Sequence, residues 1–273
     1  MPEGDAVRRT ADRLDRALAG ATLTHSDFRV PQLATTDLTG AVVDRTATHG
    51  KHLLTRLTTA DGVPLTLHTH LKMEGSWRVV RAGERWSRPA HEARVALRTE
   101  RVEAVGFLLG VVELLPTADE ASAVGHLGPD LLGPWTPADE ATALGRLTAV
   151  PDRVLGEALL DQTVVAGIGT IWLSETCFVQ GAHPLGPVSA VADPLRLLRR
   201  ARALLRAGLE HGQPLTTGDR RDPVWVYRRQ RRPCLRCRTT IEAGPVGPPG
   251  RERTTYWCPR CQPAAAAAPP PGA

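Results

Sequence analysis

The first residues of the chain, Met1-Pro2-Glu3, could provide an amine nucleophile with a carboxylate beside it. Methionine aminopeptidase removes an initial Met before a small residue, so the mature protein is expected to begin with the secondary amine of Pro2. Such an amine can attack an aldehyde carbon of a sugar and form a Schiff base, and a secondary amine gives a cationic iminium that acts as an electron sink. Glu3 could move protons in that reaction. Taken alone, the same residues also fit an ordinary frayed terminus.

Four of the five cysteines form two pairs, Cys234-x2-Cys237 and Cys258-x2-Cys261, separated by a 20-residue insert. This is the spacing of two zinc knuckles. Four thiolates close a tetrahedral shell and leave no position for water, so we expect one structural zinc ion. A zinc ribbon that serves only protein contacts is the alternative. The remaining Cys177 lies in an apolar run and is expected to be a buried, inert thiol.

The basic residues are concentrated in one segment of the chain. The net charge is +5, and residues 219–238 contain eight arginines against two aspartates. Such a cluster suits a polyanion, nucleic acid first, although a solvated basic face or a lipid-binding tail would have the same composition. Only Lys51 and Lys72 are lysines among the 34 basic residues, a modest hint that a compact ammonium matters at these positions.

Length and composition indicate a globular protein of two modest domains. The chain has 273 residues, of which 42% are hydrophobic. It contains no apolar stretch long enough to span a membrane, and its first 20 residues carry charges instead of an apolar signal core. We therefore expect a cytoplasmic protein, in whose reducing compartment paired cysteines bind metal and do not form disulfides.

In the first half of the chain, a helix is expected to hold the amino terminus to a β domain. Apolar residues repeat at helical spacing after Asp5, a plausible N-cap, and Gly20 ends the pattern. The segments that follow are short, β-branched or alternating, and separated by turn residues, which predicts a two-layer β domain. These segments are 41–48, 52–58, 64–70, 76–81, 93–99 and 102–115.

The second half is predicted to be helical, after a Gly, Pro and Trp-rich hinge at 125–137. Thr136-Pro137 caps one helix, 151–160 is a second helical run, and Asp193-Pro194 opens a periodic helix to Leu209. Between them, the glycines of 167–169 leave backbone N–H groups open at the start of a helix, which suits a phosphate.

Taken together, these residues resemble the bacterial formamidopyrimidine-DNA glycosylase and endonuclease VIII family, and most closely the actinobacterial endonuclease VIII type. The resemblance runs from Met1 to Gln262. It is carried by a collinear set of motifs: Pro2 to Gly4, 30–33 (Val-Pro-Gln-Leu), 50–54 (Gly-Lys-His-Leu-Leu), His70 to Trp77, 128–132 (Gly-Pro-Asp-Leu-Leu), 159–169, 217–219 and 253–262.

The resemblance implies an α+β fold, with an amino-terminal β-sandwich flanked by helices and a carboxy-terminal helix-two-turn-helix domain that ends in a β-hairpin zinc finger. The expected domains follow the chain in order. They are a catalytic β-sandwich at 1–116, a linker at 117–135, the helix-two-turn-helix domain at 136–215, a basic segment and zinc finger at 216–262, and a disordered tail at 263–273.

The family also implies roles for individual residues. Pro2 is the Schiff-base nucleophile and Glu3 the acid that opens the sugar and releases the base. Lys51 is a proton donor for β-elimination, and Arg253 holds the phosphates at the lesion and assists δ-elimination. DNA contacts are implied for His70, Lys72, Met73, His126, Gly169 and Thr170, with Met73 as an apolar wedge in the space that the flipped base leaves.

Three residues depart from the family pattern: Thr170 replaces an Asn that grips phosphate, Ala6 replaces a Glu, and Arg228 replaces a Gly. We expect the Thr170 hydroxyl to be taken up in capping a helix that begins at Ile171. No Arg or Phe wedge loop is found between Val102 and Val112.

We therefore predict a monomeric, bifunctional DNA glycosylase and AP lyase that acts on damaged DNA. Oxidised pyrimidines are favoured as substrates because of the Trp77 context and the Pro-Gln-Leu motif. The alternatives are the same chemistry on oxidised purines, and a zinc-finger protein that binds damaged DNA without catalysis.

Overall fold

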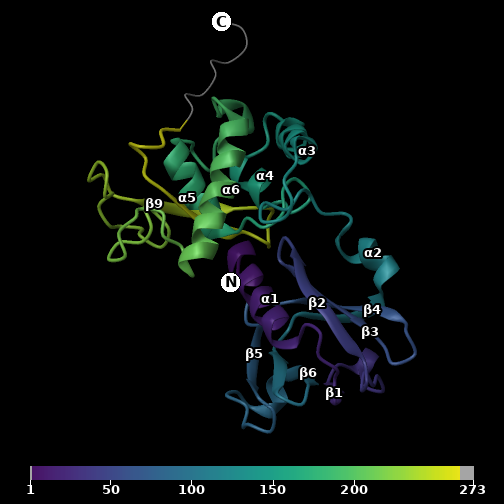
Figure 1. Ribbon diagram of the computed structural model, residues 1–273. Helices are drawn as coiled ribbons and strands as arrows, with labels where there is room; N and C mark the ends of the chain where they lie inside the picture. Colours follow the sequence, from purple (N-terminus) through teal and green to yellow (C-terminus); the bar gives the residue numbers. More distant parts are fainter. Residues whose placement is uncertain (1, 265–273) are drawn as a thin grey trace, which may run out of the picture. The chain divides into compact units, whose positions relative to one another are not determined.

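The computed structural model describes residues 2–264, and these divide into two compact units, the first ending at Leu127 and the second beginning at Gly128 (Figure 1). The finer domain boundaries expected from the sequence stay a prediction. Of the predicted tail, 263–273, residues 265–273 lie outside the described residues.

The first unit is a sandwich of two antiparallel four-stranded sheets, as the sequence predicted. One sheet has the strand order β1-β6-β7-β5 and the other β2-β3-β4-β8. The strands are β1 (His25–Phe28), β2 (Val42–His49), β3 (His52–Thr58), β4 (Pro64–His70), β5 (Ser76–Arg81), β6 (Ala93–Arg98), β7 (Val102–Phe107) and β8 (Val111–Pro116). The short helices of this unit are η1 (Pro31–Leu33), η2 (Ala90–Glu92), η3 (Thr117–Asp119) and α2 (Glu120–Val124).

The core of this unit combines residues of both sheets with one face of the first helix. Leu53 and Leu67 of one sheet and Val95 and Leu97 of the other are each fully buried in the same cluster. Helix α1 (Gly4–Leu18) buries the apolar residues that repeat along it, and it contacts strands of both sheets. The sandwich therefore anchors the start of the chain.

Two local expectations for this unit were wrong, and one strand was missed. The N-cap of α1 is Glu3, not Asp5, and Asp5 lies in the first turn, where it pairs with Arg9. The segment 102–115 is two strands and not one, because the chain reverses after β7 at Leu108, whose φ is +47°. Strand β1 was not predicted, because its sequence His-Ser-Asp-Phe is short and mostly polar.

The second unit is helical, with one β-hairpin. Its helices are α3 (Pro137–Thr148), α4 (Leu155–Leu160), α5 (Thr170–Gln180), η4 (Val188–Ala190) and α6 (Pro194–His211), and the hairpin is β9 (Glu242–Val246) with β10 (Arg253–Trp257). The caps are those predicted: Thr136 and Asp139 form a capping box, and the Asp193 carboxylate accepts from the backbone N–H of Arg196 at 2.8 Å. The predicted run 151–160 becomes helical only from Leu155.

Two hydrophobic clusters stabilise the second unit. The larger joins α3, α4, α5 and α6 and includes Trp172 together with Val246 of the hairpin. The smaller packs Phe178 of α5 against Val226, Ile241 and the cysteine-bearing segment. Helix α5 therefore connects the helical core with the hairpin region.

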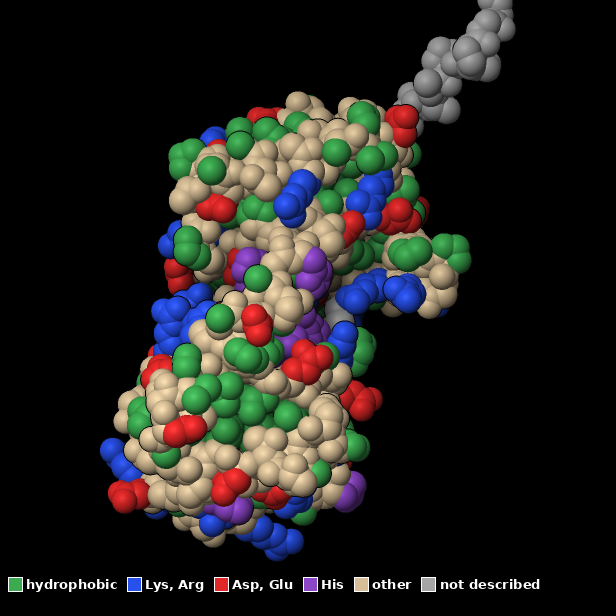
Figure 2. Space-filling view, turned by 90° about the vertical axis from the view of Figure 1, so that its right-hand side faces the viewer, with side chains coloured by type: hydrophobic (Ala, Val, Ile, Leu, Met, Phe, Trp, Pro, Cys, Tyr) green, Lys and Arg blue, Asp and Glu red, His purple; other side chains and the backbone are tan. Residues whose placement is uncertain are grey.

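Among residues 2–264, no helix combines the length and the apolarity that crossing a membrane requires. On the face drawn in Figure 2, side chains of both charges are interspersed. This face therefore has no uniform positive charge. In the sequence, the excess of arginine is confined to residues 219–238.

Candidate active site

The predicted nucleophile and its carboxylate neighbour lie at the start of α1. Pro2 is partly exposed, whereas Glu3 is 2% exposed. Glu3 is the N-cap residue, with extended backbone (φ −105°, ψ 178°), and its carbonyl accepts from the N–H of Val7 at 2.9 Å. A carboxylate at a helix N-terminus is stabilised by the helix dipole. Glu3 is therefore buried at the N-terminus of α1, directly after Pro2 in the chain.

Lys51 lies in the tight turn between β2 and β3. His49 pairs with His52, so Gly50 and Lys51 are the two turn residues. Gly50 has φ +57°, a conformation that glycine adopts at little cost. Lys51 is only 7% exposed, which is unusual for a lysine. The hairpin geometry thus holds this amine in a defined place.

The turn after β4 carries three predicted DNA contacts. The backbone N–H of Lys72 donates to His70 Nδ1 at 2.9 Å, and Lys72 has φ +51°. The Lys72 side chain crosses Gly110, where an added Cβ would lie 2.1 Å from its Cγ. Met73 is 67% exposed. The turn is therefore well defined, with its apolar side chain directed to solvent.

A hydrogen-bonded histidine chain, which the sequence analysis missed, lies next to Lys51. His52 Nδ1 and His68 Nε2 are 2.8 Å apart, and His68 Nδ1 lies 2.9 Å from Glu113 Oε2. With Glu113 ionised, His68 donates from Nδ1 and accepts from His52. The His70 ring meets the His52 ring edge-on, with centroids 4.8 Å apart. The alternation of His68 and His70 along β4 was the available signal.

The pKa of His52 is lowered to about 3, first by burial and then by the charges of His70, His68, His126 and Lys72. The pKa of His70 is lowered to about 4, first by burial and then by the charges of Lys72, Lys51 and His68. Both rings are therefore neutral at neutral pH. The structure therefore places His52 and His70 close enough to the lysines and to the other histidines for these charges to lower their pKa values.

We expect the free energy of unfolding to fall as the pH drops from about 6.5, the pKa of an unfolded histidine, towards 4. In that range His52 and His70 bind protons in the unfolded state, whereas their buried rings stay neutral in the folded state. His52→Gln should make the slope shallower by up to about one proton, which is about tenfold in the unfolding equilibrium per pH unit. Urea unfolding at a series of pH values measures this slope.

The control for this prediction is His211→Gln, at the exposed end of α6. That substitution should leave the slope unchanged, because its ring is exposed in the folded chain as in the unfolded one. An identical slope in wild type and His52→Gln would contradict the prediction.

In the second unit, the loop before α5 is held by Gln162. Its Nε2 donates to the carbonyls of Leu160 at 2.8 Å and Ile168 at 3.1 Å, and its Oε1 accepts from the N–H of Gly167, whose φ is +109°. The loop conformation therefore depends on the positive φ of Gly167 and on the Gln162 side chain, which connects residues 160, 167 and 168.

Helix α5 begins at Thr170, with Gly169 as its N-cap and no side-chain capping bond. The expectation that the Thr170 hydroxyl caps a helix starting at Ile171 was wrong, because Thr170 is itself the first helical residue. Gly169 is buried and Thr170 partly exposed. The N-terminal N–H groups of an 11-residue helix lie at this point, an arrangement suited to an anion.

Glu175 organises the segment that leads to the cysteines, which sequence reasoning did not predict. This fully buried carboxylate of α5 accepts backbone N–H groups of Trp225, Val226 and Tyr227, each at 2.9 Å, and the hydroxyl of Thr216. A buried charge with several hydrogen bonds fixes the groups around it. Residues 225–227, which lie within the arginine-rich segment, are therefore held against α5.

The four paired cysteines come together, as predicted. Their sulfur atoms lie within 4.8 Å of one another, and Cys237 Sγ is 3.4 Å from Cys258 Sγ. Ligands about 2.3 Å from a tetrahedral zinc are about 3.8 Å apart, so this set fits a single metal ion. Gln262 braces the second pair: its Oε1 accepts from the N–H of Cys258 at 2.9 Å, and its Nε2 donates to Ala182.

Cys177 is separate from this cluster and fully buried in the helical core. Burial raises the pKa of its thiol to about 12. The prediction of an inert core thiol is confirmed.

Arg253 is the first residue of β10, paired with Val246 beside the tip of the hairpin, and its side chain is exposed. It borders a cavity of about 450 Å³. The other lining residues come from 153–161 and from the hairpin, and include Arg153, Glu157, Asp161 and Arg251.

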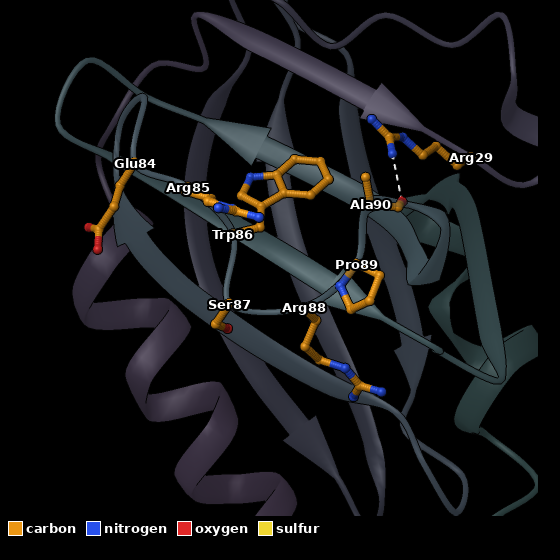
Figure 3. A pocket seen from close by; sticks show the side chains of 8 residues that line it. All are labelled: Arg29, Glu84, Arg85, Trp86, Ser87, Arg88, Pro89 and Ala90. Atoms are coloured by element: carbon orange, nitrogen blue, oxygen red, sulfur yellow. Dashed lines mark hydrogen bonds between the residues drawn. The ribbon is translucent and has the colours of Figure 1, made fainter.

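A second cavity, of about 850 Å³, shares no residue with the predicted site (Figure 3). Three arginines border it, Arg29, Arg85 and Arg88, and two of them are already engaged. Arg29 donates to the carbonyl of Ala90 at 2.7 Å and lies over the ring of Trp86, and Arg88 pairs with Glu92 at 2.6 Å. We assign this crevice no part in the chemistry.

Comparison with known proteins identifies the family. Residues 1–108 match the model of the formamidopyrimidine-DNA glycosylase N-terminal domain. A protein of Streptomyces coelicolor named "probable endonuclease 8 2" is 52% identical over 100% of this chain and 97% of its own length. The chain belongs to the formamidopyrimidine-DNA glycosylase and endonuclease VIII family.

Other members of this family support the same assignment. A DNA-(apurinic or apyrimidinic site) lyase of Mycolicibacterium smegmatis is 47% identical over 96% of this chain and 99% of its own. The fold resembles that of the Lactococcus lactis Fpg protein in complex with DNA containing an abasic site. That likeness has a TM-score of 0.79 at 21% identity and covers 96% of this chain and 100% of the other. The predicted α+β fold, with a β-sandwich and a four-cysteine hairpin region, is confirmed.

In this family member, the predicted site residues divide between the two units. The first unit carries Pro2, Glu3, Lys51, His70, Lys72, Met73 and His126, and the second carries Gly169, Thr170, Arg253 and the four cysteines. Trp77, from which the lesion preference was predicted, is 3% exposed and donates from Nε1 to Thr69 Oγ1 at 3.3 Å. This residue therefore belongs to the sandwich core.

Proposed function

We propose that Pro2 is the nucleophile of a bifunctional DNA glycosylase and AP lyase that works in bacterial base-excision repair. The observation that carries the proposal is the placement of Pro2, whose nitrogen becomes a secondary amine once Met1 is removed, next to the buried Glu3 at the start of α1. The family supports the activity, since a relative that is 47% identical is named as a DNA-(apurinic or apyrimidinic site) lyase.

The proposed first step replaces the bond to the damaged base by a bond to Pro2. The Pro2 nitrogen attacks the C1′ carbon of the sugar, and the electron pair of the glycosidic bond leaves with the base, which takes up a proton. Glu3 protonates the ring oxygen as the sugar opens, and the Pro2 nitrogen loses its proton to give the iminium. Glu3 directly follows Pro2 and is buried at the start of α1, so its carboxyl group, when protonated, lies next to the reacting amine.

The proposed second step breaks the DNA strand. The iminium acidifies the neighbouring C2′ carbon, a proton leaves it, and the C3′–O bond breaks with the phosphate as leaving group. Lys51 supplies the proton needed in this β-elimination, and Arg253 holds the phosphate and assists the δ-elimination that follows. Both roles use cations that the fold presents from a turn or a hairpin.

We propose that the other predicted residues bind the damaged strand. The target sugar is accessible only after its base is turned out of the stack, which costs a few kcal/mol. Met73, at 67% exposure, is available to fill the vacated space. His70, Lys72 and His126 contact the nucleic acid from the first unit, and Gly169 and Thr170 hold a phosphate at the start of α5.

The four cysteines are proposed to hold one structural zinc ion, since their sulfur atoms fit a single tetrahedral metal. With four thiolates the metal has no open position, so its contribution is to fold the hairpin region that carries Arg253. It takes no part in bond breaking.

Oxidised pyrimidines are the proposed substrates, because the sequence resembles the endonuclease VIII type. The same chemistry on oxidised purines is the runner-up. We propose that the protein acts as a monomer in the bacterial cytoplasm, where its DNA substrate is found.

Borohydride trapping tests the function. Reduction of the iminium gives a permanent crosslink to DNA, whereas a protein that only binds damage gives none. We expect crosslinks with oligonucleotides that contain thymine glycol, dihydrouracil or an abasic site, and a lower yield with 8-oxoguanine. Mass spectrometry of the intact protein should find Pro2 as the first residue.

A form with an uncleaved amino-terminal extension is the matched control, since it turns the Pro2 amine into an amide and leaves the rest of the chain unchanged. It should bind abasic DNA without crosslinking. Crosslinks formed equally well by the extended form would rule out Pro2, and their absence from the native protein would favour the non-catalytic alternative.

A further inference from the structure

Three arginines have a backbone conformation that favours glycine. Among residues 2–264, five non-glycine residues have positive φ, and three of them are Arg228 (+54°), Arg231 (+63°) and Arg238 (+67°). This left-handed region costs free energy for any residue with a Cβ, and arginine has no special tolerance of it. Side chains that persist in such positions point to a function.

Backbone hydrogen bonds hold two of these conformations, those of Arg231 and Arg238, without help from the arginine side chains. The N–H of Arg231 donates to the carbonyl of Ile241 at 2.9 Å, and the N–H of Ile241 donates to that of Arg232 at 3.0 Å. The N–H of Arg238 donates to the carbonyl of Cys234 at 2.9 Å, within the first cysteine pair. Glycine at these positions would keep every one of these bonds and remove the strain, so the fold does not require arginine.

The three side chains are exposed and carry charge that nothing in residues 2–264 neutralises by an ion pair. Arg228 lies over the ring of its neighbour Tyr227, at 5.5 Å. By contrast, Arg229 is 7% exposed and pairs with Asp222 at 2.6 Å. Of these four arginines, Arg229 is therefore used inside the fold, whereas Arg228, Arg231 and Arg238 are exposed.

We propose that Arg228, Arg231 and Arg238 form a surface that binds phosphates of duplex DNA beyond the damaged nucleotide. The proposal rests on the proposed function, because that function brings DNA to the unit that carries this segment. Guanidinium groups match phosphate oxygens in pairs, and side chains on a rigid support lose less conformational entropy when they bind. The surface recognises the DNA backbone and no particular base.

Substitutions at Arg231 separate charge from strain. Arg231→Gly removes both, Arg231→Ala removes the charge and keeps the strain, and Arg231→Lys keeps both. We expect the Gly and Ala variants to lower duplex affinity several-fold and to reduce the slope of log K against log salt by about 0.9, or about 2.7 for the three positions changed together. Arg231→Lys should keep the slope. Only the Gly variant should gain stability, by about twofold to fivefold in the unfolding equilibrium.

The probe is a duplex that contains a tetrahydrofuran abasic analogue, compared with an undamaged duplex of the same length, and both should lose affinity equally. Arg85→Ala, at an exposed arginine of the first unit, controls for a change in net charge. Zinc content and urea unfolding verify that each variant is folded. If the triple variant loses zinc, the salt slopes of the single variants test the proposal.

A Gly variant that is more stable and binds duplex DNA with an unchanged salt slope would overturn the proposal. Borohydride trapping of the same samples separates this outcome from a failure of the proposed function. An unchanged slope with crosslinks present contradicts the surface alone, whereas the absence of crosslinks from wild type contradicts the function.

Discussion

Glu3→Gln is expected to lower the rate of base release by about 10²- to 10⁴-fold, the usual contribution of a positioned acid or base. Cleavage at a pre-formed abasic site should persist, because the aldehyde is then already available to Pro2 and no base has to leave. The amide keeps the size of the Glu3 side chain at the N-cap of α1 and removes only its proton chemistry. Single-turnover assays on thymine glycol and abasic oligonucleotides measure the two steps separately.

Asp12→Asn is the matched control for Glu3→Gln, because it removes a carboxylate of the same helix that pairs only with Arg8 at the surface. It should leave both rates unchanged. Equal loss of base release and of abasic-site cleavage in Glu3→Gln, with normal urea unfolding, would mean that Glu3 positions the amino terminus and is not the acid.

Cys258→Ser is expected to weaken binding to duplex DNA at least about tenfold, which corresponds to about 1.4 kcal/mol. Loss of one thiolate should remove the proposed zinc, whose binding energy would fold the hairpin region. Arg253 opens β10, the strand that leads directly to Cys258, so the phosphate contact proposed for it, worth about 1.5–3 kcal/mol, should be lost with the metal. Fluorescence anisotropy with an abasic-analogue duplex measures the affinity, and zinc content is determined on the same sample.

The amine chemistry should survive this substitution, because Pro2 and Glu3 lie in the other unit. At saturating protein, the yield of trapped crosslink should match wild type. Cys177→Ala is the control: its thiol is buried in the helical core and is no metal ligand, so zinc content and affinity should be unchanged. Unchanged affinity in Cys258→Ser would exclude the hairpin region from the DNA interface.

The sequence by itself determined the features that depend on neighbouring residues. The cysteine pairs, the caps at Thr136 and Asp193 and the apolar repeat of α1 are all set by short covalent spacings. Local geometry then limits what these residues can do, so knuckles, helix starts and the core face of a helix were predicted correctly.

Errors arose where local preference was weak. The reversal at Leu108 has no glycine at the residue with φ +47°, so nothing in the sequence separated β7 from β8. Asp5 is as good an N-cap residue as any, and α1 nevertheless has its N-cap two residues earlier, at Glu3, because the buried face that starts at Gly4 decides the boundary.

Only the tertiary structure decided which distant side chains meet. His68 faces Glu113 because β4 pairs with β8, 45 residues further along the chain, and His52 meets His70 through the register of β3 with β4. Glu175 binds the backbone of 225–227 because α5 packs beneath that segment. The left-handed conformations of Arg231 and Arg238 likewise follow from hydrogen bonds to Ile241 and Cys234. Strand register and helix packing are set by the whole core at once, so no local pattern could have predicted these contacts.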